Sequence, residues 1–167
     1  MSRPLDVVDT RPPELDDKPR EECGVVAITG IEAAAELAFL GLYALQHRGQ
    51  EAPGMVAVDG EGNARVHKGL GLVADVFDAE ALKGLPGSTA LGHVRYSTAG
   101  GGGARNAQPI VVRYAEGDLA VAHNGNLTNA HDLRSWLVRV GSIFQGTNDS
   151  EVVVHLVARS RHEQVDL

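Results

Sequence analysis

The stretch "REECGVVAIT", residues 20–29, marks an abrupt change from a charged segment to an apolar one. Residues 1–22 carry four prolines among mixed charges and few large apolar side chains, too few to offset the entropy of ordering, so we predict a disordered leader. From Cys23 onward the run is apolar and β-branched, which predicts a buried strand ending at Gly30. The folded unit is therefore predicted to span residues 23–167, with the only cysteine at its edge.

The next segment, "EAAAELAFLGLYALQHRG" (residues 32–49), predicts a helix that Gly49 stops. Its apolar residues at helical spacing are Leu37, Leu40, Ala44 and Leu45. Five short runs separated by Gly, Pro, Asn and Asp then predict antiparallel strands. These runs are "GMVAVD" (54–59), "ARVHKG" (64–69), "TALGHVRYST" (89–98), "IVVRY" (110–114) and "DLAVAHNG" (118–125).

Shorter helices complete the pattern. "DAEALKGL" (78–85) predicts a short helix, and "AGGGGARNAQP" (99–109) has no periodicity and predicts a flexible loop. "TNAHDLRSWLVRV" (128–140) predicts a helix, and "NDSEVVVHLVARS" (148–160) predicts another that opens on capping residues. The first of these helices places Leu133, Trp136, Leu137 and Val140 on one face. Helices at both ends with strands grouped between them predict an α+β layered fold.

Composition limits the functions that fit. The 167 residues carry a net charge of -7, which argues against a nucleic-acid surface or an anionic membrane surface and favours a small-molecule substrate. No apolar run is long enough to span a bilayer, so we expect no membrane partner. One cysteine cannot form an intramolecular disulfide, which is compatible with the cytoplasm. The seven histidines are scattered without metal-ligand spacing, so we predict no metal site.

Cys23 has two interpretations. A single cysteine beside an apolar strand is more often an inert, small hydrophobic residue. If the leader were removed between Glu22 and Cys23, however, one residue would carry both a thiol and a free α-amine, whose reference pKa of about 7.7–8.0 suits a general base.

Other polar residues also have two interpretations each. Asn124-Gly125 is typical of a hairpin turn, but an Asn amide and a Gly N–H at a turn can also stabilise an oxyanion. Arg95 lies in a predicted strand, where its guanidinium would need either an internal carboxylate or one from a ligand. Asp149 stands at a predicted helix start, where it would either cap the helix or pair with a substrate ammonium.

Several stretches, taken together and in this order, resemble the glutamine-hydrolysing domain of class II amidotransferases, a family of N-terminal-nucleophile hydrolases. Within this family the match is close to the branch whose acceptor is phosphoribosyl pyrophosphate. The matching stretches are "ECGVVAI", "ALQHRGQE", "GLGLVADVF", "GHVRYSTAG", "NAQP", "AHNGNLTNA" and "TNDSEVV". The resemblance implies a four-layer αββα sandwich of antiparallel sheets, incomplete at its carboxyl-terminal end, with the phosphoribosyltransferase domain absent.

The resemblance also implies a role for each matching residue. Cys23 would be the nucleophile, freed by removal of a propeptide, and its α-amine the base. Asn124 and Gly125 would form the oxyanion hole. The substrate-binding residues it implies are Arg95 and nearby Thr98 for the glutamine α-carboxylate, Asp149 for the α-ammonium, and Arg48 on a loop that closes over glutamine.

The implied reaction is hydrolysis of glutamine to glutamate and ammonia through a Cys23 thioester. The ammonia would convert phosphoribosyl pyrophosphate to 5-phosphoribosylamine in the first step of purine biosynthesis, through the missing domain. The full-length enzyme would be a homo-oligomer with Mg and a [4Fe-4S] cluster, whereas this chain would hold no cofactor. Two alternatives stay open: a non-catalytic fragment, and an aminosugar-forming relative, against which Gln50 and Tyr96 argue because that relative has Tyr and Trp there.

Overall fold

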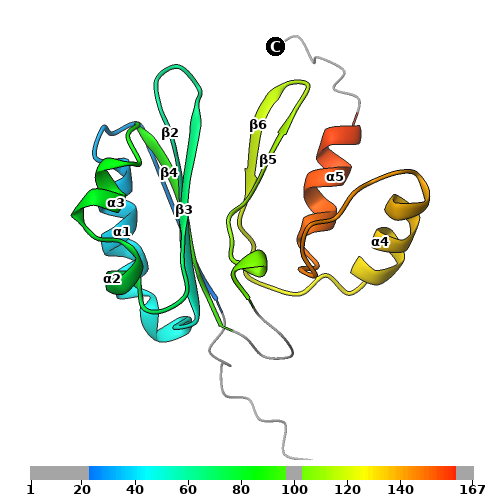
Figure 1. Ribbon diagram of the computed structural model, residues 1–167, viewed down its shortest axis with the longest axis horizontal. Coiled ribbons are helices and arrows are strands. Elements are labelled where there is room, and N and C mark those ends of the chain that lie inside the picture. Colours follow the sequence, from blue (N-terminus) through cyan, green and yellow to red (C-terminus); the bar gives the residue numbers. More distant parts are fainter. Residues whose placement is uncertain (1–22, 97–102, 161–167) are drawn as a thin grey trace, which may run out of the picture.

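The computed structural model describes residues 23–96 and 103–160, which form the predicted αββα layers (Figure 1). The proposed leader, residues 1–22, lies outside this range. Helices α1 (Ala34–Ala44), α2 (Val73–Val76) and α3 (Ala79–Lys83) cover one sheet. Helix α5 (Glu151–Arg159) covers the other, and α4 (Ala130–Arg139) packs against α5. None of the helices in these two stretches is long and apolar enough to cross a membrane.

The first sheet contains β1 (Gly24–Thr29), β2 (Ala52–Val58), β3 (Ala64–Lys68) and β4 (Thr89–Arg95) in the order β1-β4-β2-β3, all antiparallel. The second sheet is the hairpin of β5 (Ile110–Tyr114) and β6 (Gly117–Val121). Every predicted strand is present, with ends shifted by a few residues. The antiparallel prediction is confirmed, and the strands divide between two sheets that face each other.

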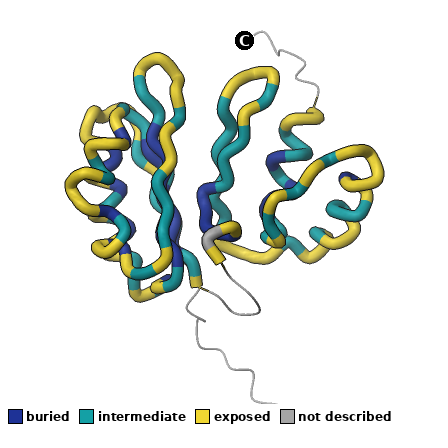
Figure 2. The backbone as a smooth tube through the Cα atoms, viewed as in Figure 1, coloured by how far each residue is buried: buried dark blue, intermediate teal, exposed yellow. Residues whose placement is uncertain are grey.

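The main core lies between α1 and the first sheet, and its helix face differs from the predicted one. Leu37 and Leu40 are 39% and 59% exposed, whereas Ala38 and Leu42 are fully buried. The reason is close packing: a Cβ added at Gly92 of β4 would lie 2.7 Å from the Leu42 side chain. Leu42 and the small residues Ala34, Ala35 and Ala38 therefore meet the sheet, whereas Leu37 and Leu40 are exposed. The tube in Figure 2 shows exposed residues along the outer side of this layer.

The predicted face of α4 is also only partly correct. Leu137 is fully buried, but Trp136 and Val140 are each 44% exposed. Helix α5 also carries buried residues, including Val152 and Val154, and packs on β5 and β6.

The sequence missed helix α2 and the 3-10 helix η2 (Ala104–Asn106). The prediction of a flexible loop over residues 99–109 is wrong for the second half of this segment, because Asn106 to Pro109 are buried. Residues 99–102 lie outside the described range. Non-local partners order the rest: the Asn106 amide donates to Thr147 Oγ1 at 2.8 Å and accepts from Thr147 N at 2.9 Å.

The first sheet contacts the segment that leads into β5 of the second sheet. Lys68 of β3 donates from Nζ to the carbonyl of Ala107 at 3.0 Å, and burial lowers the pKa of this lysine. On the neighbouring strand, a Cβ at Gly54 would lie 2.2 Å from the carbonyl oxygen of Gln108. This glycine therefore lets residues 107–108 lie directly against the first sheet.

Candidate active site

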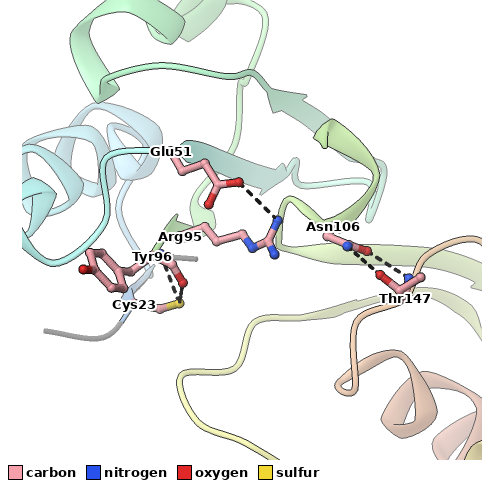
Figure 3. A network of polar contacts seen from close by, with 6 residues as sticks. All are labelled: Cys23, Glu51, Arg95, Tyr96, Asn106 and Thr147. Carbon is pink, nitrogen blue, oxygen red and sulfur yellow. Dashed lines mark hydrogen bonds and ion pairs between the residues drawn. The ribbon is translucent and has the colours of Figure 1, made fainter. Parts of the chain in front are cut away.

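Cys23 immediately precedes β1, and strand pairing places it beside the end of β4. Its Sγ accepts a hydrogen bond from Tyr96 N at 3.5 Å and lies 3.9 Å from Tyr96 O (Figure 3). The residue is half-buried and its thiol is free. The strand register therefore holds the sulfur at a sheet end, beside the residue that follows Arg95 of β4.

Arg95 ends β4 with most of its side chain buried, at 14% exposure. Its Nη1 lies 3.7 Å from Glu51 Oε1, an ion pair too long to be a hydrogen bond (Figure 3). Among the described residues, Nη1 and Glu51 Oε2 are both buried without a hydrogen-bond partner. The internal salt bridge that the sequence left open is present, but it leaves guanidinium donor capacity for a ligand carboxylate.

Arg48 lies in the 3-10 helix η1 (Gln46–Arg48), which follows α1, and its Nε donates to the Cys23 carbonyl at 3.4 Å. The next residue, Gly49, is buried, and a Cβ there would lie 2.6 Å from the Arg95 carbonyl carbon. The turn after α1 can therefore approach β4 only with glycine at this position. The structure thus brings Cys23, Arg48 and Arg95 together.

Asn124 and Gly125 lie in the loop after β6, both exposed, and Gly125 has φ of 153°. Within the described part of the chain no hydrogen bond joins them to Cys23. The preceding residue is firmly held: His123 N donates to Gln108 Oε1 at 2.7 Å, and Gln108 Nε2 donates to His123 O at 3.2 Å.

Asp149 contacts the other end of this loop. Its Oδ2 accepts from Leu127 N at 2.7 Å, and its Oδ1 accepts from Ser150 N at 2.8 Å. The Ser150 hydroxyl lies 2.9 Å from His123 Nδ1. The structure therefore groups Asp149 with Asn124 and Gly125, and it shows no ion pair between Asp149 and the Arg95 group in the described stretches.

His93 of β4 lies between the two groups and is fully buried. Burial lowers its pKa to about 4, and the positive charge of Arg95 acts in the same direction, whereas the nearby His123 backbone opposes it. The histidine is therefore neutral near pH 7.

Two polar residues of this region were not singled out from the sequence. Glu51 follows the "QHRGQ" turn and faces Arg95, and Gln108 faces His123 from a segment predicted as a loop. Thr98, the remaining predicted site residue, lies outside the described range. Along the two described stretches, no group of three or more His, Cys, Asp and Glu residues could hold a metal ion.

Two cavities in the described part of the chain lie away from this site. A cavity of about 390 Å³ is lined by residues of β3, α2 and α3. A second cavity, of about 560 Å³, is lined by residues near the start of α1, in α3 and in the segment just before β4. Neither is lined by Cys23 or Arg95. The candidate site is therefore defined by its side-chain chemistry.

A family model described as a glutamine amidotransferase domain matches residues 93–166. The chain is 52% identical to an amidophosphoribosyltransferase of Bacillus subtilis and 51% identical to one of Lacticaseibacillus casei. These alignments cover 85% and 83% of this chain and 30% and 72% of the respective relatives.

A solved structure titled as the allosteric regulatory enzyme of purine biosynthesis superposes with a TM-score of 0.78 at 51% identity. The glutamine phosphoribosylpyrophosphate amidotransferase of B. subtilis, solved with ADP and GMP, gives 0.76 at 47% identity. Each match covers 83% of this chain and 30% of that structure, so the chain spans about a third of the length of many relatives. The predicted N-terminal-nucleophile hydrolase fold is confirmed. Sequence identity, coverage and fold agree, and the chain therefore belongs to the amidophosphoribosyltransferase family, in its glutamine amidotransferase domain.

Proposed function

We propose that this domain hydrolyses glutamine to glutamate and ammonia, with Cys23 as the nucleophile. The observation that carries the proposal is the placement of the Cys23 thiol against the main chain of Tyr96, next in sequence to Arg95, whose buried guanidinium has spare donor capacity. A buried guanidinium that is not fully paired favours a carboxylate ligand. The glutamine α-carboxylate is such a ligand, and Arg48 lies close enough to Cys23 to cover the bound substrate.

In the proposed mechanism, cleavage of the Glu22-Cys23 bond frees the Cys23 α-amine. The amine takes the thiol proton as Sγ forms a bond to the side-chain amide carbon of glutamine. The carbonyl electron pair moves onto oxygen, and the resulting oxyanion accepts hydrogen bonds from Asn124 and Gly125. The protonated amine then gives its proton to the leaving nitrogen, which departs as ammonia and leaves a thioester.

Water then attacks the thioester, and the same amine acts as base, so that glutamate leaves and the thiol is regenerated. Asp149 is proposed to pair with the substrate α-ammonium, and Thr98 to assist Arg95 with the α-carboxylate. All these steps use groups of this chain.

We further propose that the ammonia converts phosphoribosyl pyrophosphate to 5-phosphoribosylamine, the first step of purine biosynthesis. Support comes from the names of the relatives, which are amidophosphoribosyltransferases, and from their additional length. The acceptor site would lie in that additional length.

The test measures ammonia release from glutamine by the purified gene product, with and without phosphoribosyl pyrophosphate. We expect release of ammonia and glutamate in equal amounts. Glutamine turnover that survives Cys23→Ala would contradict the mechanism. Formation of an amino sugar, with no pyrophosphate released from phosphoribosyl pyrophosphate, would contradict the proposed acceptor.

A further inference from the structure

Gln108 is a buried amide with two hydrogen bonds to the main chain of a single residue. Only 5% of it is exposed, its Oε1 accepts from His123 N at 2.7 Å, and its Nε2 donates to His123 O at 3.2 Å. His123 directly precedes Asn124. The side chain therefore fixes the peptide groups on both sides of the residue from which the Asn124-Gly125 loop begins.

Gln108 is itself held in place by the first sheet. Its carbonyl oxygen lies so close to Gly54 that a Cβ there would be 2.2 Å away. The neighbouring Ala107 carbonyl accepts from Lys68 Nζ at 3.0 Å. Gln108 thus links β2 and β3 of the first sheet to the loop after β6.

The far end of the loop has a separate anchor, because Leu127 N donates to Asp149 Oδ2 at 2.7 Å. Between the two anchors lie only Asn124, Gly125 and Asn126, all exposed. A short exposed segment fixed at both ends by polar contacts presents its N–H donors in a defined direction before any ligand binds. Such preorganisation is what stabilisation of an oxyanion requires.

We propose that Gln108 is a positioning residue for glutamine hydrolysis, holding the Asn124 and Gly125 donors where the oxyanion forms. This inference rests on the proposed function. Gln108 contacts neither the Cys23 sulfur nor Arg95, the proposed partner of the substrate carboxylate. Its loss should therefore destabilise the transition state more than it weakens substrate binding. The expected signature is a lower kcat with KM nearly unchanged.

The first test is Gln108→Met in the purified gene product, which keeps side-chain volume and removes both hydrogen bonds. We expect kcat for ammonia release to fall about 10- to 100-fold, which is no more than the loss from deleting an oxyanion-hole donor. We expect KM to stay within about twofold of wild type. Alkylation of Cys23 by iodoacetamide, which needs no oxyanion hole, should keep its wild-type rate.

The second test is Gln108→Glu, which keeps the shape and remains informative if the Met variant fails to fold. In this variant an ionised carboxylate would accept from His123 N but repel His123 O, whereas a protonated carboxyl would restore both hydrogen bonds. The ratio of its kcat to that of wild type should therefore rise as pH falls. A ratio independent of pH would contradict the proposal.

The matched control is Leu85→Val, a core substitution before the start of β4, at the opposite end of that strand from Arg95. It should lower the melting temperature while leaving kcat near wild type. An unchanged kcat in Gln108→Met, or an equal loss in Leu85→Val, would overturn the proposal while the glutaminase activity of wild type stands. A wild-type protein that releases no ammonia would overturn the proposed function and this inference with it.

Discussion

At the scale of single residues, Arg95 combines features that ordinary surface arginines lack. Its side chain is 14% exposed, and its nearest carboxylate oxygen, on Glu51, lies at 3.7 Å. A buried charge with an incomplete set of hydrogen bonds is unfavourable by itself. The arrangement becomes favourable when a second carboxylate binds, which is the role proposed for the substrate.

Replacing Arg95 by Gln should raise KM for glutamine by about 10- to 100-fold, because a hydrogen bond to a charged group contributes about 1.5–3 kcal/mol. Steady-state kinetics of ammonia release measure the change. Iodoacetamide alkylation of Cys23 serves as the control and should be little altered. A KM equal to wild type would show that Arg95 does not hold the substrate.

The sequence predicted some residues of this site and missed others, for a physical reason. Cys23 and Arg95 stood out because a thiol at a strand start and a guanidinium within a strand are each unusual locally. Gln108 and Glu51 did not, because their importance lies in contacts with His123 and Arg95, which are distant in sequence. No local pattern encodes such pairings.

At the scale of the elements, α1 shows the limit of periodicity. The segment is apolar on nearly every side, so spacing alone could not select the face that packs on the sheet. The close approach of the helix to the sheet selects the face that packs. Leu42 packs over Gly92, where an added Cβ would lie 2.7 Å from the leucine side chain. Gly41 packs against Val26 of β1, where an added Cβ would lie 3.0 Å from the valine side chain. The helix itself and all the strands were predictable, because each has a strong local pattern and clear breakers.

Two substitutions on α1 should therefore differ sharply. Leu42→Ala removes a fully buried side chain and should lower the free energy of unfolding by about 2–5 kcal/mol. Leu40→Ala, at a position 59% exposed, should change it by less than about 0.5 kcal/mol. Urea unfolding of both variants measures the difference, and equal effects would mean that α1 packs by the other face.

At the scale of the whole molecule, His93 links stability to pH, because it is a fully buried histidine of β4 whose ring nitrogens have no hydrogen-bond partner of normal geometry among the described residues. Its folded pKa is about 4, against a reference value of 6.5. Between these values the unfolded chain binds the proton more readily than the folded one. Acidification from pH 6.5 to 4 should thus remove stability, and this contribution is constant below pH 4.

The shift from 6.5 to about 4 corresponds to an upper bound of about 3.4 kcal/mol, at about 1.36 kcal/mol per pKa unit. We expect urea unfolding to show a steeper loss of stability between pH 6.5 and 4 in wild type than in His93→Gln, which cannot titrate. Lys68, Arg95 and His123 influence His93 electrostatically and stay in both proteins, so the difference isolates this group. Parallel pH profiles would contradict the assignment.

The most direct test of the account combines intact mass with glutamine turnover on the same purified gene product. The account predicts that the active protein begins at Cys23 and releases ammonia from glutamine, and that Cys23→Ala releases none while keeping its melting temperature. A protein that retains residues 1–22 and still turns over glutamine, or a Cys23→Ala variant with wild-type activity, would contradict it.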